Sequence, residues 1–323
     1  MPRPRSQLIS LSDTPFYHCV SRCVRRAYLC GEDELSGQNY EHRRGWLEQL
    51  LLFACEAFAI KLCSYAIMSN HYHVVLHVRP DLALSWSDYD VVERWHRLYA
   101  GTPVSSRFLA NQTLSNEEKL ALNPLISLWR ERLTNISWLM RVVNERIARR
   151  ANAEDDCTGS FWEGRFKSQA LLDDQALLSC MAYVDLNPIR ANQATGLKQS
   201  DYTSVKRRIA AVMGTKDLPS CIESFVGNQA DRMGIPYGLK DYLDLVQWSG
   251  KIIRPDKSGY IPEAAPNLLE ELNIDAQGWS LLTTQFELRF RSWVGAEQIT
   301  KSIYNRSRRP TWPRKRNPIT LSI

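Results

Sequence analysis

Two adjacent apolar segments predict a pair of neighbouring β-strands in the middle of this sequence. KLCSYAIMS (residues 61–69) and YHVVLHV (residues 72–78) are each the length of a strand, and they meet near Ser69-Asn70. Arg79-Pro80 ends the second strand, because proline has no amide hydrogen to donate to a neighbouring strand. Any fold of the chain has to include these two strands.

The segments around this pair fix the order of elements. PFYHCVSRC (residues 15–23) is rich in strand-forming residues, and residues 40–60 carry apolar side chains at helical spacing. KSQALL (residues 167–172) predicts another strand, after which Asp173 or Asp174 caps a further helix. With residues 81–152 set aside, the order is strand, helix, strand, strand, strand, helix. This order predicts an α+β fold, with a small antiparallel sheet and helices on one face.

Two further regions enlarge this unit. Residues 81–152 have a helical pattern with polar breaks around residues 101–103 and 111–116, which indicates a helical insertion. Beyond about Tyr202 the composition changes, and loops near residues 227–238 and 254–266 alternate with short helical segments. We therefore expect a mainly helical C-terminal extension.

The second central strand carries three of the six histidines of the chain, His71, His73 and His77. Side chains alternate along a strand, so all three point to one face. Same-face neighbours lie roughly 6.5 Å apart, which lets His71 and His73 bind one metal ion, whereas His77 lies roughly 13 Å beyond His73. The alternative is a pair of half-exposed strand histidines without a ligand.

Tyr183 and Asn187, in MAYVDLNPIRA (residues 181–191), are four residues apart. On a helix they share one face, roughly 6 Å apart. A phenol can act as a covalent nucleophile, and an amide oxygen can complete a metal site. Alternatively, the tyrosine packs in the core and the asparagine ends the helix before Pro188.

Basic residues are unevenly distributed in a chain whose net charge is +6. The tail, residues 301–323, carries seven Lys or Arg and no acid, and Arg141, Arg146, Arg149 and Arg150 follow one another in RVVNERIARR. Clustered guanidinium groups beside aromatic residues suit a nucleic-acid backbone. A solvated tail with no partner is the alternative.

The sequence predicts neither membrane insertion nor secretion. No stretch approaches eighteen uninterrupted apolar residues, and MPRPRSQLISLSDTP lacks the apolar centre of a signal peptide. The eight cysteines include no Cys-x-x-Cys pair, so we expect free thiols and a cytoplasmic location.

Four separated motifs occur together in one order: YHCVSR, MSNHYHVVLHV, FWEGRFKSQALL and YVDLNPIRA. Together they resemble the single-tyrosine HUH transposases, and most closely the REP-associated tyrosine transposases. The resemblance covers roughly residues 1–200 and implies a ferredoxin-like HUH domain there, which agrees with the order of elements. Residues 201–323 then form an accessory region with a basic C-terminal tail. Neither this region nor the insertion matches a motif.

The resemblance also implies a mechanism. His71, His73 and Asn187 would bind Mg²⁺ or Mn²⁺, and Tyr183 would be the nucleophile. The substrate would be single-stranded DNA, folded into a hairpin, which is nicked and joined through a 5′-phosphotyrosine intermediate. Whether one chain or a homodimer forms the site stays open.

Residues beside the motifs are candidates for DNA contacts. Arg22, Arg165 and Lys167 could bind phosphates, and Trp162 and Phe161 could stack on an unpaired base. Ordinary surface charge and an aromatic core are the respective alternatives.

Two other functions are compatible with these motifs. One is a non-catalytic DNA-binding protein derived from a transposase, and the other is a replication initiator or relaxase with HUH chemistry. The presence of all four site residues together favours the transposase.

Overall fold

The computed structural model describes residues 8–24, 29–32, 37–227, 229, 233–253, 266–290 and 292–300. The basic tail, residues 301–323, lies outside the described residues.

A five-stranded sheet forms the centre of the fold. Its strands are β1 (Phe16–Arg22), β2 (Ile60–Ile67), β3 (His71–Val78), β4 (Lys167–Leu171) and β5 (Trp293–Val294), in the spatial order β2-β3-β1-β4-β5. The first four strands pair antiparallel, as the sequence predicts, whereas the two-residue β5 adds a parallel edge beside β4. The order β2-β3-β1-β4 is that of a ferredoxin-like sheet. The α+β class is confirmed.

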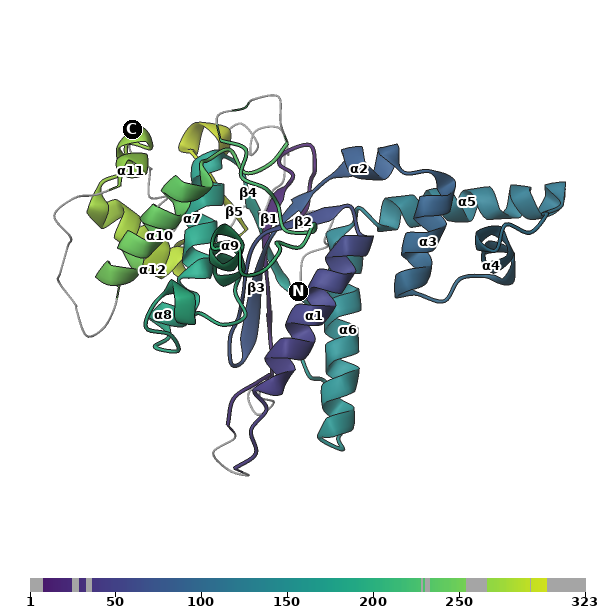
Figure 1. The fold of residues 1–323 in the computed structure, drawn as a ribbon, viewed down its shortest axis with the longest axis horizontal. Coiled ribbons are helices and arrows are strands. Elements are labelled where there is room, and N and C mark those ends of the chain that lie inside the picture. The colour runs from purple at the N-terminus through teal and green to yellow at the C-terminus, as the bar shows by residue number, and fades with distance from the viewer. Residues whose placement is uncertain are drawn as a thin grey trace, which may run out of the picture.

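Helices cover both faces of the sheet, so the prediction of helices on one face is wrong (Figure 1). Helix α1 (His42–Ala57) packs with α6 (Ile136–Glu154) on one face, and α7 (Asp174–Asp185) packs against β2, β3 and β4 on the other. The physical reason is that β2 and β3 are buried almost continuously, so neither of their faces can be left to water.

Most of the predicted insertion forms an arm that projects from the sheet (Figure 1). Its helices are α2 (Pro80–Ser85), α3 (Asp88–Leu98), α4 (Pro103–Leu109) and α5 (Asn116–Arg132). The side chains of Ser87, Thr102 and Ser115 cap the last three, and the helix breaks fall where the polar segments predict them. The last helix of the predicted insertion, α6, is part of the core instead.

The C-terminal extension is mainly helical, as expected. It contains α9 (Ser204–Val212), α10 (Leu239–Ile252), α11 (Asn267–Glu271) and α12 (Ala276–Arg289), and it follows the short α8 (Asn187–Arg190). Helices α10 and α12 share a core with α7, and α9 packs on β2, so the extension lies on the face opposite α1 and α6 (Figure 1). Among the described helices, none has the length and apolar character needed to cross a bilayer.

Asp185 ties α7 to the extension through buried hydrogen bonds. Its carboxylate accepts from Ser64 Oγ at 3.0 Å, Ser204 Oγ at 2.7 Å and Tyr242 Oη at 2.5 Å. The side chain is fully buried, so these three hydroxyls have no water to replace the carboxylate. The position of α7 therefore depends on β2, α9 and α10.

We expect Asp185→Ala to lower the free energy of unfolding by about 3–5 kcal/mol, because it leaves three hydroxyls without their acceptor. Asp244→Ala, on the exposed side of α10, is the matched control and should change stability by less than about 0.5 kcal/mol. Urea unfolding measures both. Equal unfolding midpoints for the two variants would contradict the role assigned to Asp185.

Candidate active site

The sheet register brings polar side chains together at one end of the face that α7 covers. His71 lies opposite Arg22 and His73 opposite Val20, so His71, His73, Arg22 and His18 share this face. On the other side of β1, Gln169 pairs with His18 and Lys167 pairs with Val20, which adds both β4 side chains to the same face. His77, on the same face of β3, bonds instead to Glu223 at 2.6 Å.

A chain of hydrogen bonds fixes the orientation of His73. Gln169 Nε2 donates to the Phe290 carbonyl at 2.5 Å, so Gln169 Oε1 faces His18 Nδ1 at 2.7 Å and accepts a hydrogen bond from it. Neutral His18 then accepts at Nε2 from His73 Nδ1, 3.0 Å away. This tautomer, inferred from the partners, leaves the lone pair of His73 on Nε2, which is buried and without a hydrogen-bond partner among the described residues.

His71 presents the same nitrogen. Its Nδ1 lies 2.6 Å from Asn70 Oδ1 and donates to it, which leaves the lone pair on Nε2. The rings of His71 and His73 are 4.8 Å apart between centroids and nearly perpendicular. Two imidazoles with bare Nε2 atoms on one strand face are suited to binding one metal ion.

All three imidazoles of the cluster are held neutral. Burial lowers the pKa of His71 to about 4, with Arg22 and Arg190 acting in the same direction. Burial also lowers the pKa of His18, and it holds that of His73 well below its usual range. Neutral imidazole is the form that binds a metal ion.

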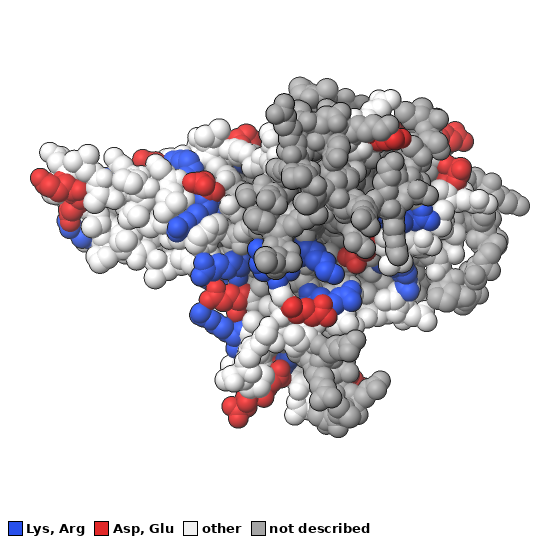
Figure 2. Space-filling view, turned by 180° about the vertical axis from the view of Figure 1, so that it is seen from behind, with Lys and Arg blue, Asp and Glu red and all other residues white. Residues whose placement is uncertain are grey.

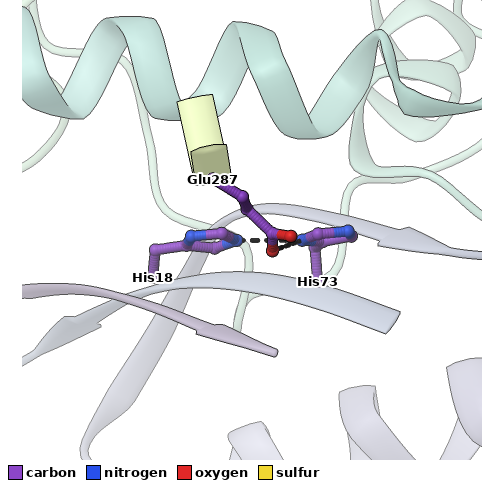
Figure 3. Close-up of side chains that lie close together, drawn as sticks. All are labelled: His18, His73 and Glu287. Atoms are coloured by element: carbon purple, nitrogen blue, oxygen red, sulfur yellow. Dashed lines mark hydrogen bonds and ion pairs between the residues drawn. The ribbon is translucent and has the colours of Figure 1, made fainter. Parts of the chain in front are cut away.

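Glu287 adds a carboxylate from α12. It reaches from the helix above the sheet toward the two imidazoles of His18 and His73 (Figure 3), and its Oε1 lies 3.6 Å from His73 Nδ1. One potential ligand atom from each of these three residues lies within 4.8 Å of the others. They form a second candidate metal group, which shares only His73 with the group expected from the sequence.

Tyr183 lies directly over this cluster. Its ring is 5.7 Å from the ring of His73 and 6.3 Å from that of His18, in edge-on contact with both. Phe286 stacks on it at 5.5 Å, and the guanidinium carbon of Arg190 lies 4.0 Å from the ring centroid. The side chain is 6% exposed, and this burial raises the pKa of Tyr183 to about 12, although Arg190 acts in the opposite direction.

Asn187 follows Tyr183 by one turn but begins a new helix. Helix α7 ends at Asp185, Leu186 keeps a helical conformation, and α8 starts at Asn187, so the turn between the two residues is preserved. Asn187 Oδ1 accepts a hydrogen bond from Arg190, while its buried Nδ2 has no partner among the described residues. An amide oxygen beside Tyr183 is therefore available at one of its lone pairs.

The candidate DNA contacts divide into two groups. Arg22 and Lys167 lie at the strand ends beside His71, and both lower its pKa. Arg165 is exposed in the loop before β4. Figure 2 shows Lys and Arg side chains gathered, with a few acids between them, in the middle of one face beside the base of the arm.

Trp162 and Phe161 lie instead in the core on the opposite face. Both are buried, at 8% and 3% exposed. Trp162 Nε1 donates to the Asn144 carbonyl at 2.8 Å, and its ring packs 5.7 Å from that of Tyr72. This arrangement corresponds to the aromatic-core alternative.

Three neighbours of the cluster were not singled out from the sequence. His18 and Arg190 stand inside the quoted motifs YHCVSR and YVDLNPIRA. The pairing register of the first strand would have indicated His18, and the helical spacing after Asn187 would have indicated Arg190. Glu287 has no such signal, because it stands in α12, more than a hundred residues after Tyr183 in the chain.

No protein-family model matches the chain, and no curated protein matches it. A solved structure of a REP-associated tyrosine transposase bound to a REP hairpin matches with a TM-score of 0.38 and 10% sequence identity. The match covers 70% of this chain and 100% of that one. A likeness this low carries no argument about function.

Proposed function

We propose that this protein is a metal-dependent nuclease that cleaves and rejoins single-stranded DNA through Tyr183, as a transposase does. The observation that carries the proposal is the contact between the ring of Tyr183 and that of His73, whose buried Nε2 has no partner among the described residues. A metal ion bound to that nitrogen would lie beside the phenol and could polarise a phosphate that the phenol attacks.

Two imidazole nitrogens and an amide oxygen are donor types that suit a divalent ion. His71 and His73 would hold Mg²⁺ or Mn²⁺ through their bare Nε2 atoms, and Asn187 Oδ1 would be the third ligand. When bound there, the ion supplies positive charge to a non-bridging phosphate oxygen. His18 and Gln169 would act as positioning residues that keep the His73 lone pair on Nε2.

The side chains of the cluster would carry out one displacement. Arg22 and Lys167 hold the phosphates of the strand, and Tyr183 Oη attacks the phosphorus. The Tyr183 O–P bond forms and the P–O3′ bond breaks, so the phenol loses a proton and the 3′-oxygen gains one. One phosphoester replaces another, which lets a 3′-hydroxyl reverse the step and join strands without a nucleotide cofactor.

A denaturing gel tests this function. Wild-type protein is incubated with Mn²⁺ and a 5′- or 3′-labelled single-stranded oligonucleotide, with and without a hairpin. We expect a shortened strand and a covalent protein–DNA adduct, both absent in excess EDTA. DNA binding without an adduct would instead support the non-catalytic alternative, and full-rate cleavage in EDTA would rule out the metal site.

Metal affinity separates the two candidate ligand groups. If His71, His73 and Asn187 bind the ion, His18→Gln should weaken Mn²⁺ binding about 10–100-fold, because the orientation of His73 is lost. Glu287→Gln should change it little, since Glu287 is then no ligand. Calorimetric titration with Mn²⁺ measures both, and a larger loss in Glu287→Gln than in His71→Ala would favour the group around Glu287.

A further inference from the structure

Arg190 is a half-buried cation whose hydrogen-bond partners are neutral. Its Nη1 donates to the Thr283 carbonyl at 2.8 Å, and its Nη2 donates to Asn187 Oδ1. Its guanidinium carbon lies 4.0 Å from the centroid of the Tyr183 ring. Among the described residues no carboxylate forms an ion pair with it, although Glu287, which lies beside His73, and the Tyr183 hydroxyl both favour its charged form. A cation held in this way is stabilised when an anion arrives.

A second buried arginine shows what a structural guanidinium looks like in the same molecule. Arg208 is 1% exposed and donates to the backbone carbonyls of Cys63 and Glu223, so it is enclosed by the fold. Arg190 is only half-buried and stands in the last turn of α8, beside Tyr183. An anion from outside can therefore reach Arg190, whereas Arg208 is closed off.

Two exposed cations stand on the same side of the site. Arg22 at the end of β1 pairs with His71, and Lys167 at the start of β4 pairs with Val20, the β1 residue opposite His73. Arg190 reaches the same side of the site from α8, over the Tyr183 ring. Neither Arg22 nor Lys167 forms an ion pair with a described carboxylate. Three elements thus bring one cation each to the partly open edge of the cluster at His71.

We propose that Arg190 binds the phosphodiester that Tyr183 attacks. This inference rests on the proposed function and assigns one phosphate of the strand to one residue. The planar guanidinium can donate two parallel hydrogen bonds to the two non-bridging oxygens of a phosphate. Because Arg190 already lies over the Tyr183 ring, a phosphate bound to it is held beside Oη, while Arg22 and Lys167 take the phosphates that flank it.

Neutral phosphate analogues test this assignment without any chemistry. In a Tyr183→Phe background with EDTA present, fluorescence anisotropy gives the affinity for a labelled single-stranded oligonucleotide. A series of oligonucleotides carries one uncharged methylphosphonate at each position in turn. With unmodified DNA we expect Arg190→Gln to weaken binding about 10-fold, as loss of a charge-assisted hydrogen bond does.

The informative quantity is the coupling between the protein change and the DNA change. When the methylphosphonate replaces the phosphate that wild-type protein cleaves, Arg190→Gln should not weaken DNA binding any further. When it replaces a phosphate at another position, Arg190→Gln should still weaken binding about as much as with unmodified DNA. Arg22→Gln is the matched control and should couple to a different phosphate. Arg190→Lys, which keeps the charge and guards against misfolding, should couple to the same phosphate as the parent with a smaller loss.

The possible results distinguish a failure of the Arg190 assignment from a failure of the proposed function. Equal losses from Arg190→Gln at every position, or coupling to a phosphate that is not cleaved, would overturn the assignment even if wild-type protein forms an adduct. Absence of any adduct would sink the proposed function, and with it the assignment of Arg190 to an attacked phosphate.

Discussion

Tyr183→Phe is expected to lower formation of the protein–DNA adduct by roughly 10⁴–10⁶-fold, because it removes the attacking oxygen. The phenyl ring keeps its stacking on Phe286 and its contacts with His73 and Arg190, so the fold and DNA binding should be preserved. The assay is the denaturing gel with Mn²⁺ and labelled DNA, together with an anisotropy titration of the same variant.

Tyr72→Phe is the matched control for this change. Tyr72 stands between His71 and His73 in the sequence, but its side chain points to the opposite face and its hydroxyl donates to Asn144 at 2.7 Å. Losing that hydrogen bond should cost about 1 kcal/mol of stability and leave the adduct intact. An adduct that persists in Tyr183→Phe and disappears in Tyr72→Phe would reverse the assignment.

His73→Ala should have the second-largest effect, with a loss of more than about 100-fold in Mn²⁺ affinity and a parallel loss of cleavage. His73 is the residue common to both candidate groups, and its ring lies nearer to that of Tyr183 than the ring of His18 does. DNA affinity in EDTA should change little, because Arg22 and Lys167 remain. Calorimetry with Mn²⁺ and the denaturing gel are run on the same preparation.

His77→Gln separates loss of a ligand from loss of a buried histidine. His77 lies on the same strand face, but it bonds to Glu223 and is four residues beyond His73 along β3. Its substitution should lower stability while leaving Mn²⁺ affinity within about two-fold, since a residue outside the site contributes nothing to binding. Equal losses of Mn²⁺ affinity in His73→Ala and His77→Gln would mean that the fold, not the ligand, had been removed.

The strands and the capped helix α7 could be predicted from the sequence because their signals are local. The apolar runs of β2 and β3, and Asp173 before Ala176, specify their own segments whatever packs around them. The second helical layer was missed because α10 and α12, which complete it, carry no pattern that says which sheet face they cover. The continuous burial of β3 contained that information, since a two-sided apolar strand needs cover on both faces.

The residues of the candidate site also differ in whether a local sequence pattern predicts them. Strand alternation places His71 and His73 on one sheet face, and helical spacing places Tyr183 and Asn187 one turn apart, so each pair could be predicted from a short motif. The contact of Tyr183 with His73 comes from the packing of α7 on the sheet. Glu287 and Phe286 reach the site only through the packing of α12 against α7, which no local pattern encodes. The sequence leaves base stacking and core packing open for Trp162, because an aromatic residue in a loop with glycines looks the same in a sequence whether it is exposed or, as here, buried.

Peptide mapping of the adduct tests the central claim most directly. Trypsin cleaves after Lys167 and after Arg190, and the peptide between them, residues 168–190, contains Tyr183 and no other tyrosine. After wild-type protein has reacted with single-stranded DNA and Mn²⁺, nuclease trimming and mass spectrometry should find that peptide carrying a 5′-linked nucleotide. A nucleotide on a peptide that contains another tyrosine would contradict the account, as would complete cleavage of the DNA with every tyrosine unmodified.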